Sequence, residues 1–268
     1  MHLPQTNWFG FVKPSLIVQM MAGLSLKVSK LGRLGRFVQF ARSYGVPRAG
    51  IYFMNTTFFD LRTGLNTARS MPSKVAGVPP DLLGDSVDYL PSWTVTIRKA
   101  FRVVKQTLGA QALGSTFVDV GAGKGKVCIV WAQELRRARI ASGDLLAVDI
   151  SEVLCGVASE NLAKAGLTGK VRIVIEDAAQ LSLDEHPQIL LWLYNPFGAE
   201  TLSKLLRETY GRVVGIVYSN PVAHETVVSA GYELIYQEEG WHPNLSFTIY
   251  VPRNLRNPHS SALLPLRH

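Results

Sequence analysis

Three glycines at alternate positions form the stretch of this chain best suited to bind a ligand. Gly121, Gly123 and Gly125 follow a short apolar run that contains Asp119, and an apolar, helix-like segment comes after them. Glycines in such a turn let backbone N–H groups approach a ligand closely. A glycine loop alone does not specify the ligand. The elements around the loop must therefore be considered next.

Short apolar strands alternate with helices from residue 116 onward. The strands are expected at 116–120, 145–150, 171–175, 189–193, 213–218, 232–237 and 245–251, and the helices at 125–139, 151–165, 200–210 and 224–230. Near-continuous apolar strands separated by helices predict an α/β fold with a doubly wound, mostly parallel sheet. The last two strands should be antiparallel, because their connection is too short for a crossover helix.

Four of these strands end in a polar side chain. The end residues are Asp119, Asp149, Asp177 (followed by Ala178) and Asn195. In an open parallel sheet, ligands bind at the carboxyl ends of the strands. Asp149 could accept bonds from two ribose hydroxyls, since Ser151 is already suited to cap the next helix. Asp177 and Ala178 could recognise an adenine amino group, and a helix-capping role for Asp177 is the alternative.

Two cofactors fit a glycine loop of this kind. A dinucleotide fold places a pyrophosphate at the start of the helix, with glycines in a G-x-G-x-x-G pattern. Here the glycines are spaced differently, and Asp119 just before them would repel a pyrophosphate. A carboxylate instead attracts a cationic sulfonium or an ammonium group. The residues therefore favour S-adenosylmethionine over NAD.

The segment Val118-Asp119-Val120-Gly121-Ala122-Gly123-Lys124-Gly125 resembles motif I of class I S-adenosylmethionine-dependent methyltransferases. Ala147-Val148-Asp149 is similar to the ribose-binding acid of that family, and Glu176-Asp177-Ala178 to its adenine-side motif. The resemblance covers about residues 86 to 252. It implies a seven-stranded sheet whose antiparallel last strand is inserted between the fifth and the sixth. It implies nothing specific about the methyl acceptor.

Two further segments resemble parts of methyltransferases that act on nitrogen. Asn195-Pro196-Phe197 resembles the D/N-P-P-F/Y motif of amino-directed enzymes, although it has only one proline. The resemblance implies that Asn195 receives the target nitrogen and that Phe197 packs against the acceptor. Tyr89-Leu90-Pro91-Ser92 is similar to an element of seven-stranded lysine methyltransferases, in which the aromatic ring covers the cofactor. Together they indicate an N-methyltransferase, with protein lysine as one candidate acceptor.

No general base is evident in the sequence. His186 and His224 are candidates by residue type alone, and His242, in the turn between the last two strands, could contact the substrate. An aromatic acceptor wall could include Tyr194 and Trp241 in addition to Phe197, whereas core packing is the stronger expectation for Tyr218. A small-molecule or RNA acceptor, and a protein that binds S-adenosylmethionine without catalysis, are the alternatives.

The first part of the chain differs from the rest in charge. Residues 1–59 hold seven basic and no acidic residues, out of a net charge of +8 for the whole chain. Residues 1–85 are expected to form a basic arm, with a helix over 24–44 and an irregular, turn-rich segment over 45–84. This segment could be a lid, and Ser92 is expected to cap the helix over 93–108. The helix of the arm is expected to pack on the domain with a solvated basic face, and contact with an anionic surface, either a membrane or a nucleic acid, is the alternative.

The remaining expectations concern compartment and boundaries. Cys128 and Cys155 are expected to be small buried hydrophobic residues, so neither a disulfide nor a metal site is predicted. The chain is expected to be cytoplasmic, with peripheral membrane association through the arm and an organelle transit peptide as alternatives. Residues 86–253 should form the methyltransferase domain, and residues 254–268 a disordered tail.

Overall fold

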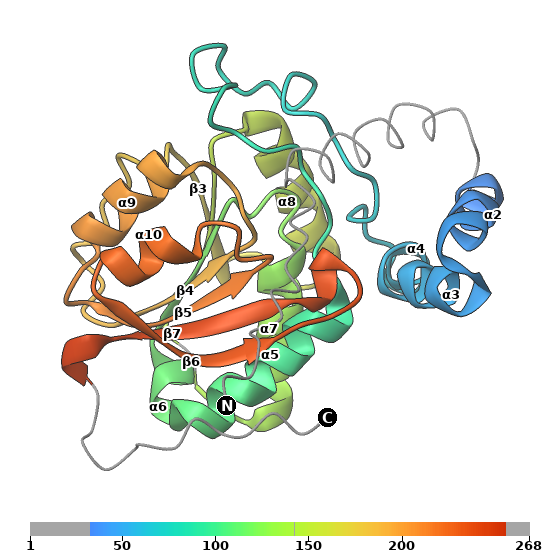
Figure 1. Cartoon of the computed structure of the whole chain (residues 1–268). Coiled ribbons are helices and arrows are strands. Elements are labelled where there is room, and N and C mark those ends of the chain that lie inside the picture. Colours follow the sequence, from blue (N-terminus) through green and yellow to red (C-terminus); the bar gives the residue numbers. More distant parts are fainter. Residues whose placement is uncertain (1–32, 142, 256–268) are drawn as a thin grey trace, which may run out of the picture. The chain divides into compact units, whose positions relative to one another are not determined.

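The computed structural model describes residues 33–141 and 143–255 (Figure 1). These residues divide into two compact units between Ile51 and Tyr52. The expected helix over 24–44 is described only from Arg33, where α2 (Arg33–Tyr44) begins, and its first part lies outside the described residues. The tail expected after residue 253 also lies mostly outside them. The expected division after residue 85 stays a prediction.

The second unit contains a seven-stranded sheet, as expected. Its strands are β1 (Thr116–Val120), β2 (Leu145–Asp149), β3 (Val171–Ile175), β4 (Ile189–Leu193), β5 (Val213–Ser219), β6 (Tyr232–Glu238) and β7 (Phe247–Pro252). Their order is β3-β2-β1-β4-β5-β7-β6, and β7 runs antiparallel to both of its neighbours. The predicted insertion of the last strand between the fifth and sixth is confirmed.

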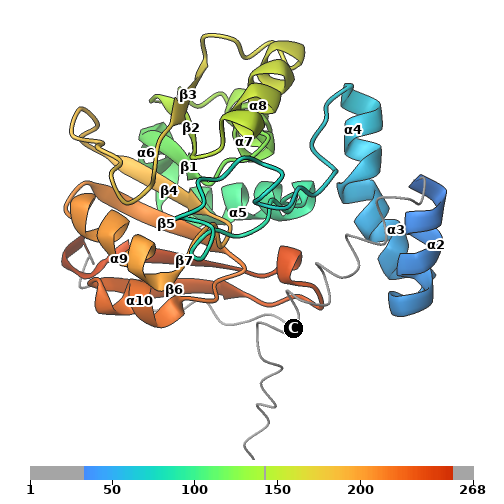
Figure 2. The same cartoon turned by 90° about the horizontal axis from the view of Figure 1, so that it is seen from above.

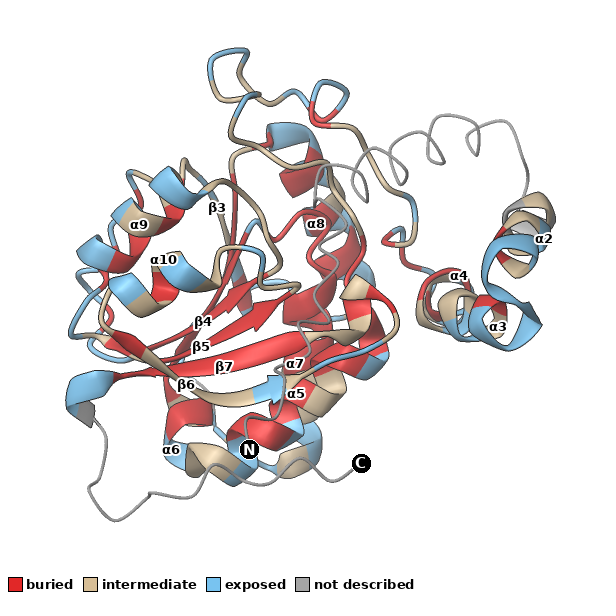
Figure 3. Cartoon of the chain, viewed as in Figure 1, coloured by how far each residue is buried: buried red, intermediate tan, exposed pale blue. Residues whose placement is uncertain are grey.

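Helices cover both faces of the sheet (Figure 2). They are α5 (Thr94–Thr107), α6 (Gly109–Gly114), α7 (Lys126–Ala138), α8 (Glu152–Lys164), α9 (Ala199–Glu208) and α10 (His224–Ser229). One hydrophobic cluster joins one sheet face to α5 and α7, and a second joins the other face to α9 and α10. Residues of β1, β2 and β4 are buried throughout because neighbouring strands and both helical layers enclose them (Figure 3).

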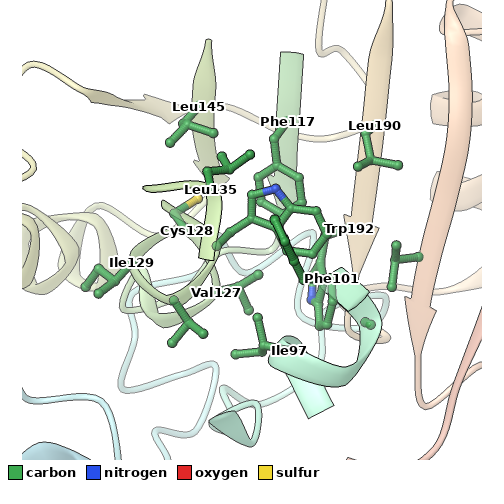
Figure 4. Packing of buried hydrophobic residues seen from close by; sticks show 14 of the residues in the cluster. Ile97, Phe101, Phe117, Val127, Cys128, Ile129, Leu135, Leu145, Leu190 and Trp192 are labelled. Carbon is green, nitrogen blue, oxygen red and sulfur yellow. The ribbon is translucent and has the colours of Figure 1, made fainter. Parts of the chain in front are cut away.

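Aromatic rings of β1, β4, α5 and α7 pack together within the first of these clusters (Figure 4). The ring of Phe117 on β1 stacks on Trp131 of α7 at 4.3 Å between centroids. Phe101 of α5 and Trp192 of β4 meet Trp131 edge-on, at 5.1 and 6.1 Å. Aromatic pairs of this geometry add to the stability gained from burial. The packing therefore fixes β1, β4 and α7, the elements on which the glycine loop depends.

The expectation of an irregular segment over 45–84 was partly wrong. Two helices, α3 (Val46–Asn55) and α4 (Thr57–Thr63), occupy its first half. Pro47 lies in the first turn of α3, where no backbone donor is needed, and Gly64 ends α4 in a left-handed conformation with a φ of 73°. Turn-forming residues thus mark the helix ends here. Beyond Gly64 the chain is irregular, as expected.

The expected cap at Ser92 was also wrong. Helix α5 begins at Thr94, and Trp93 at its N-cap position provides no side-chain hydrogen bond. The Val95 N–H donates instead to Oδ1 of Asn55, 40 residues earlier in the chain, at 2.9 Å. A short connecting 3₁₀ turn, η1 (Pro243–Leu245), precedes β7, and another, η2 (Arg253–Leu255), follows it.

Cys128 and Cys155 are free and buried. No helix in residues 33–141 and 143–255 combines the length and the apolar character needed to cross a bilayer.

The carboxyl ends of β1 and β4 lie side by side where the strand order reverses, so the segments that follow them meet at the switch point of the sheet.

Candidate functional site

The glycine loop leaves β1 at this switch point and is closely enclosed. Gly121, Gly123 and Gly125 all have positive φ, at 76°, 54° and 75°. A Cβ added to Gly121 would lie 2.3 Å from Cβ of Pro196, and one added to Gly123 would lie 2.2 Å from the Tyr89 ring. Backbone conformation and available space therefore both require glycine at these two positions. The loop, Tyr89 and Pro196, which were singled out separately in the sequence, are adjacent in the fold.

Asp149 at the end of β2 is bonded directly to this loop. Its Oδ2 accepts a hydrogen bond from the Gly123 N–H at 2.7 Å, and its Oδ1 accepts one from the Ser151 N–H at 2.9 Å. Burial raises the pKa of the Asp149 carboxyl, and these backbone donors oppose the rise. Each carboxylate oxygen can accept a second bond, so capacity for two hydroxyl donors is retained. Ser151 caps α8 as expected, because its Oγ accepts the Leu154 N–H at 3.0 Å.

Asp119 is a second buried acid beside the loop, with 2% of its surface exposed. Burial raises the pKa of its carboxyl well above the ordinary value, and the Asp149 charge raises it further. A hydrogen bond from the Cys128 thiol, with 3.9 Å from Sγ to Oδ2, opposes this rise. A nearby cation would favour ionisation of both acids. The electrostatics of this region therefore suit a positively charged ligand.

Asp177 lies after β3, beside the end of β2. Its Oδ1 accepts the Ala179 N–H at 2.9 Å, and Ala178 between them is buried. This bond caps a turn and not the start of a helix, which was the expected alternative to adenine recognition, since no helix lies between β3 and β4 in this described part of the chain. The adenine role of Asp177 and Ala178 stays a prediction, because one oxygen and the neighbouring backbone could still serve it.

Asn195 follows β4 and adopts a left-handed conformation, with a φ of 43°. Its Oδ1 accepts a hydrogen bond from the Tyr218 hydroxyl at 3.4 Å. Burial raises the pKa of Tyr218 to about 12, so this phenol stays protonated and can act as the donor at neutral pH. The interaction fixes the Asn195 amide at the switch point, beside the loop that Pro196 touches.

Phe197 and Gly198 are held by a segment more than a hundred residues earlier in the chain. Ser86 and Phe197 form an isolated antiparallel bridge. The Gly198 N–H donates to Oδ1 of Asp85 at 3.0 Å, and Thr201 Oγ1 donates to Oδ2 at 2.6 Å. Asp85 was not anticipated, since an acid in a turn-rich stretch has no signal of a distant partner. It fixes the turn that carries Asn195, Pro196 and Phe197.

The three histidines occupy different environments. His186 Nδ1 lies 3.1 Å from Oγ1 of Thr116, at the start of β1 and thus at the end of the strand away from the glycine loop. His224 Nδ1 lies 2.8 Å from the Tyr250 hydroxyl. His242 stacks on Trp93 at 4.6 Å, and burial lowers its pKa to about 4, so it is neutral at pH 7. None of the contacts described for these rings involves Asn195.

The aromatic side chains expected near the acceptor are partly grouped. Trp241 meets Trp93 edge-on at 5.9 Å. Burial raises the pKa of Tyr194, and a hydrogen bond with the Asn244 side chain opposes that rise. Tyr218 is buried as expected, and in addition it contacts Asn195. Tyr194 and Trp241 therefore stay candidates for the acceptor wall.

Two lysines beside the glycines were not singled out in the sequence. Lys124 and Lys126 are only 1% and 2% exposed. Nζ of Lys124 donates to the Arg69 carbonyl at 2.8 Å, and Nζ of Lys126 donates to the Asn55 carbonyl at 2.6 Å. Burial lowers the pKa of Lys124 to about 8 and that of Lys126 to about 7. Lysines are ordinarily solvated, so this burial could not be predicted from the residue types.

Comparisons with known proteins agree with the fold and the loop. Residues 117–215 match the family described as Methyltransferase domain. The curated ribosomal protein L11 methyltransferase of Pelotomaculum thermopropionicum is 38% identical over 61 residues, which are 23% of this chain and 18% of that protein. The match thus spans less than a fifth of the relative's length.

Solved structures of low sequence identity are also similar. The ribosomal protein L11 methylase of Lactobacillus delbrueckii subsp. bulgaricus is 16% identical with a TM-score of 0.43, over 66% of this chain and 83% of that chain. The magnesium protoporphyrin IX methyltransferase of Synechocystis PCC 6803, determined with bound SAM, is 15% identical with a TM-score of 0.45, over 59% and 79%. Residues 117–215 belong to the methyltransferase domain family, and the chain therefore carries a class I, S-adenosylmethionine-dependent methyltransferase domain.

Proposed function

We propose that the protein transfers a methyl group from S-adenosylmethionine to a nitrogen acceptor. The observation that carries this proposal is the position of Asn195 after β4, with its amide bonded to Tyr218 and the following Pro196 against Gly121. An amide oxygen with one lone pair still free can accept a hydrogen bond from a target amine. Protein lysine is the specific acceptor that we favour.

The residues around the glycine loop fit the cofactor. We assign Gly121, Gly123 and Gly125 to the backbone cradle, since two of them leave no space for a side chain. Asp119 would face the cationic part, Asp149 the ribose, and Asp177 with Ala178 the adenine. Tyr89 would cover the cofactor from the side of Gly123. When bound, S-adenosylmethionine supplies an electrophilic methyl group on a sulfonium.

The chain contributes mainly positioning to such a transfer. A nucleophile must lie in line with the methyl group, and alignment together with exclusion of water can supply most of the rate. Asn195 would orient the nitrogen and Phe197 would pack against the acceptor. The similarity of 61 residues to the ribosomal protein L11 methyltransferase of Pelotomaculum supports a protein acceptor. Small molecules and RNA remain the alternative acceptors.

The basic charge of the N-terminal residues suggests a separate role for that part of the chain. We propose that residues 86–253 act as the catalytic domain in the cytoplasm and that the basic arm within residues 1–85 contacts an anionic surface. Seven basic residues and no acid over residues 1–59 support this role of the arm. Removal of residues 1–51, at the boundary between the compact units, should weaken sedimentation with anionic vesicles and leave cofactor affinity unchanged.

Two measurements test the proposed reaction. Calorimetry with S-adenosylmethionine, S-adenosylhomocysteine and NAD examines the cofactor, and binding of NAD alone would refute the assignment. Transfer of labelled methyl groups into a fractionated cell extract then sorts protein, RNA and small-molecule acceptors. Label found only in RNA would rule out the lysine proposal. Binding without label in any fraction would favour a non-catalytic protein.

A further inference from the structure

Four consecutive residues, Asn66–Arg69, are linked to the glycine loop, directly at Arg69 and through the Asn161 side chain at Asn66. We refer to them as the 66–69 segment. Nζ of Lys124 donates to the carbonyl of Arg69 at 2.8 Å. The side chain of Asn161 on α8 donates through Nδ2 to the Lys124 carbonyl at 3.0 Å and to the Asn66 carbonyl at 3.3 Å. Its Oδ1 accepts the Asn66 N–H at 2.9 Å, so one buried amide pairs with both backbones.

Asp60 in the first turn of α4 determines the shape of this segment. Its Oδ2 accepts the N–H groups of Thr67 and Ala68, at 2.7 and 2.6 Å, and its Oδ1 accepts the Thr67 hydroxyl at 2.6 Å. The Thr67 carbonyl in turn accepts the Tyr89 hydroxyl at 2.9 Å. Three charge-assisted bonds on one carboxylate make a strong local constraint. Asp60 therefore fixes Thr67, which fixes the tyrosine that covers Gly123.

The contacts of Tyr89 and Lys124 complete the connection. The Tyr89 ring occupies the space where a Gly123 side chain would be, and Lys124 Nζ lies 5.1 Å from the centre of that ring. Burial lowers the pKa of Lys124. The charge of Asp60 opposes this lowering, whereas the charge of Arg69 adds to it. Asp60 likewise opposes proton loss at Lys126. One carboxylate is thus both the organiser of the segment and the nearby counter-charge for two buried amines.

We propose that Asp60 and Asn161 are positioning residues for cofactor binding: through the 66–69 segment they hold the backbone of Gly123 and Lys124 in the conformation that receives S-adenosylmethionine. The proposal rests on the proposed function for the identity of the ligand. The sequence suggested a turn or a lid for the 66–69 segment. We assign this segment instead to the fixed inner wall of the site. Neither residue is expected to contact the reacting atoms.

Hydrogen exchange of the ligand-free protein tests the structural half of this proposal. Asp60→Asn places an amide against the Thr67 and Ala68 N–H groups, and Asn161→Asp replaces the Nδ2 donor with an oxygen. Asp88→Asn is the matched control, because Asp88 uses a single Oδ1 to accept the Ser73 N–H and hydroxyl, and an amide oxygen can replace it. A peptide spanning residues 119–127 should exchange about tenfold faster in the first two variants and at the native rate in the control.

Calorimetry with S-adenosylmethionine tests the functional half. Affinity should fall about tenfold or more for Asp60→Asn and Asn161→Asp and stay within about twofold for Asp88→Asn. The proposal would be overturned if residues 119–127 exchanged at the native rate in both variants. It would also be overturned if the exchange of β4 became faster to the same extent as that of residues 119–127. Native affinity in a variant whose loop exchanges faster would overturn it as well. Asn161→Asp keeps the test available if Asp60→Asn does not fold.

The outcome for the unmodified protein separates the two proposals. If the native protein binds no S-adenosylmethionine, the proposed function fails. Faster hydrogen exchange confined to residues 119–127 in the variants would still support the positioning of the loop. If the native protein binds the cofactor and the variants bind it equally well, the proposed function stands and the roles of Asp60 and Asn161 are refuted.

Discussion

The carboxylate of Asp149 accepts a hydrogen bond from the backbone N–H of Gly123 at 2.7 Å, which joins the end of β2 to the loop that follows β1. The two residues are 26 positions apart in the sequence. The same carboxylate is the expected partner of the ribose. The geometry of the glycine loop and the presentation of the ribose acceptor therefore depend on each other.

Replacement of Asp149 should weaken cofactor binding. Asp149→Asn removes the charge and leaves only one acceptor oxygen for Gly123, Ser151 and the ribose. Loss of one charge-assisted hydrogen bond costs about 1.5–3 kcal/mol, so the Kd for S-adenosylmethionine in calorimetry should rise roughly 10- to 100-fold. Asp144→Asn, just before the other end of β2, is the control and should bind normally. Equal affinity in both variants would contradict the ribose role of Asp149.

Replacement of Gly123 should reveal the enclosure of the loop. Alanine at a positive φ is strained by about 1–2 kcal/mol, and at Gly123 it would also displace the Tyr89 ring. Gly166→Ala is the control, since Gly166 has a φ of 67° and nothing within 4 Å of an added Cβ. Denaturant unfolding should show a larger loss of stability for Gly123→Ala, and only this variant should lose cofactor affinity. Equal losses of stability in Gly123→Ala and Gly166→Ala would mean that the Tyr89 ring moves aside without cost.

Removal of the Asn195 amide should chiefly lower turnover. Asn195→Gly deletes the side chain without strain at the positive φ, because glycine adopts that conformation readily. Asn220→Gly, at a φ of 51° after β5, is the matched control. Once an acceptor fraction is known, labelled methyl transfer should fall at least about tenfold for Asn195→Gly, with little change in cofactor affinity. Undiminished transfer would show that Asn195 does not receive the acceptor.

Burial of Lys126 predicts a rise of stability with pH. The folded pKa of about 7 lies below the ordinary value of 10.5, so between these values the unfolded chain binds more protons than the native protein. The free energy of unfolding should then increase from pH 7 to pH 9, by roughly 1–3 kcal/mol from this residue. Urea unfolding of Lys126→Met should lack this part of the increase.

Lys99→Met provides the control for that experiment. Its side chain is 42% exposed and its ammonium pairs with Glu238 at 2.7 Å, so its replacement should leave the slope between pH 7 and pH 9 unchanged. An unaltered slope in Lys126→Met would show that this amine remains charged in the folded protein.

The sheet and the helices around it could be predicted from local sequence patterns. Buried parallel strands must be apolar along their whole length, and runs such as Ile189–Leu193 are bounded by polar or turn residues, so their position and type could be predicted. Ser151 could be assigned as a cap because its partner lies three residues away. The motif around Gly121, Gly123 and Gly125 indicated the cofactor class, because spacing and residue type are local properties.

The residues that enclose that loop come from distant segments and could not be predicted in this way. Asp60, Asn161 and Asp85 act on residues 7 to 116 positions away, and no local pattern specifies such partners. The burial of Lys124 and Lys126 has the same origin, since the Arg69 and Asn55 carbonyls reach these amines only when the chain has folded. Local preferences fix strands and helices, whereas the pairing of buried polar groups requires segments that only the folded chain brings together.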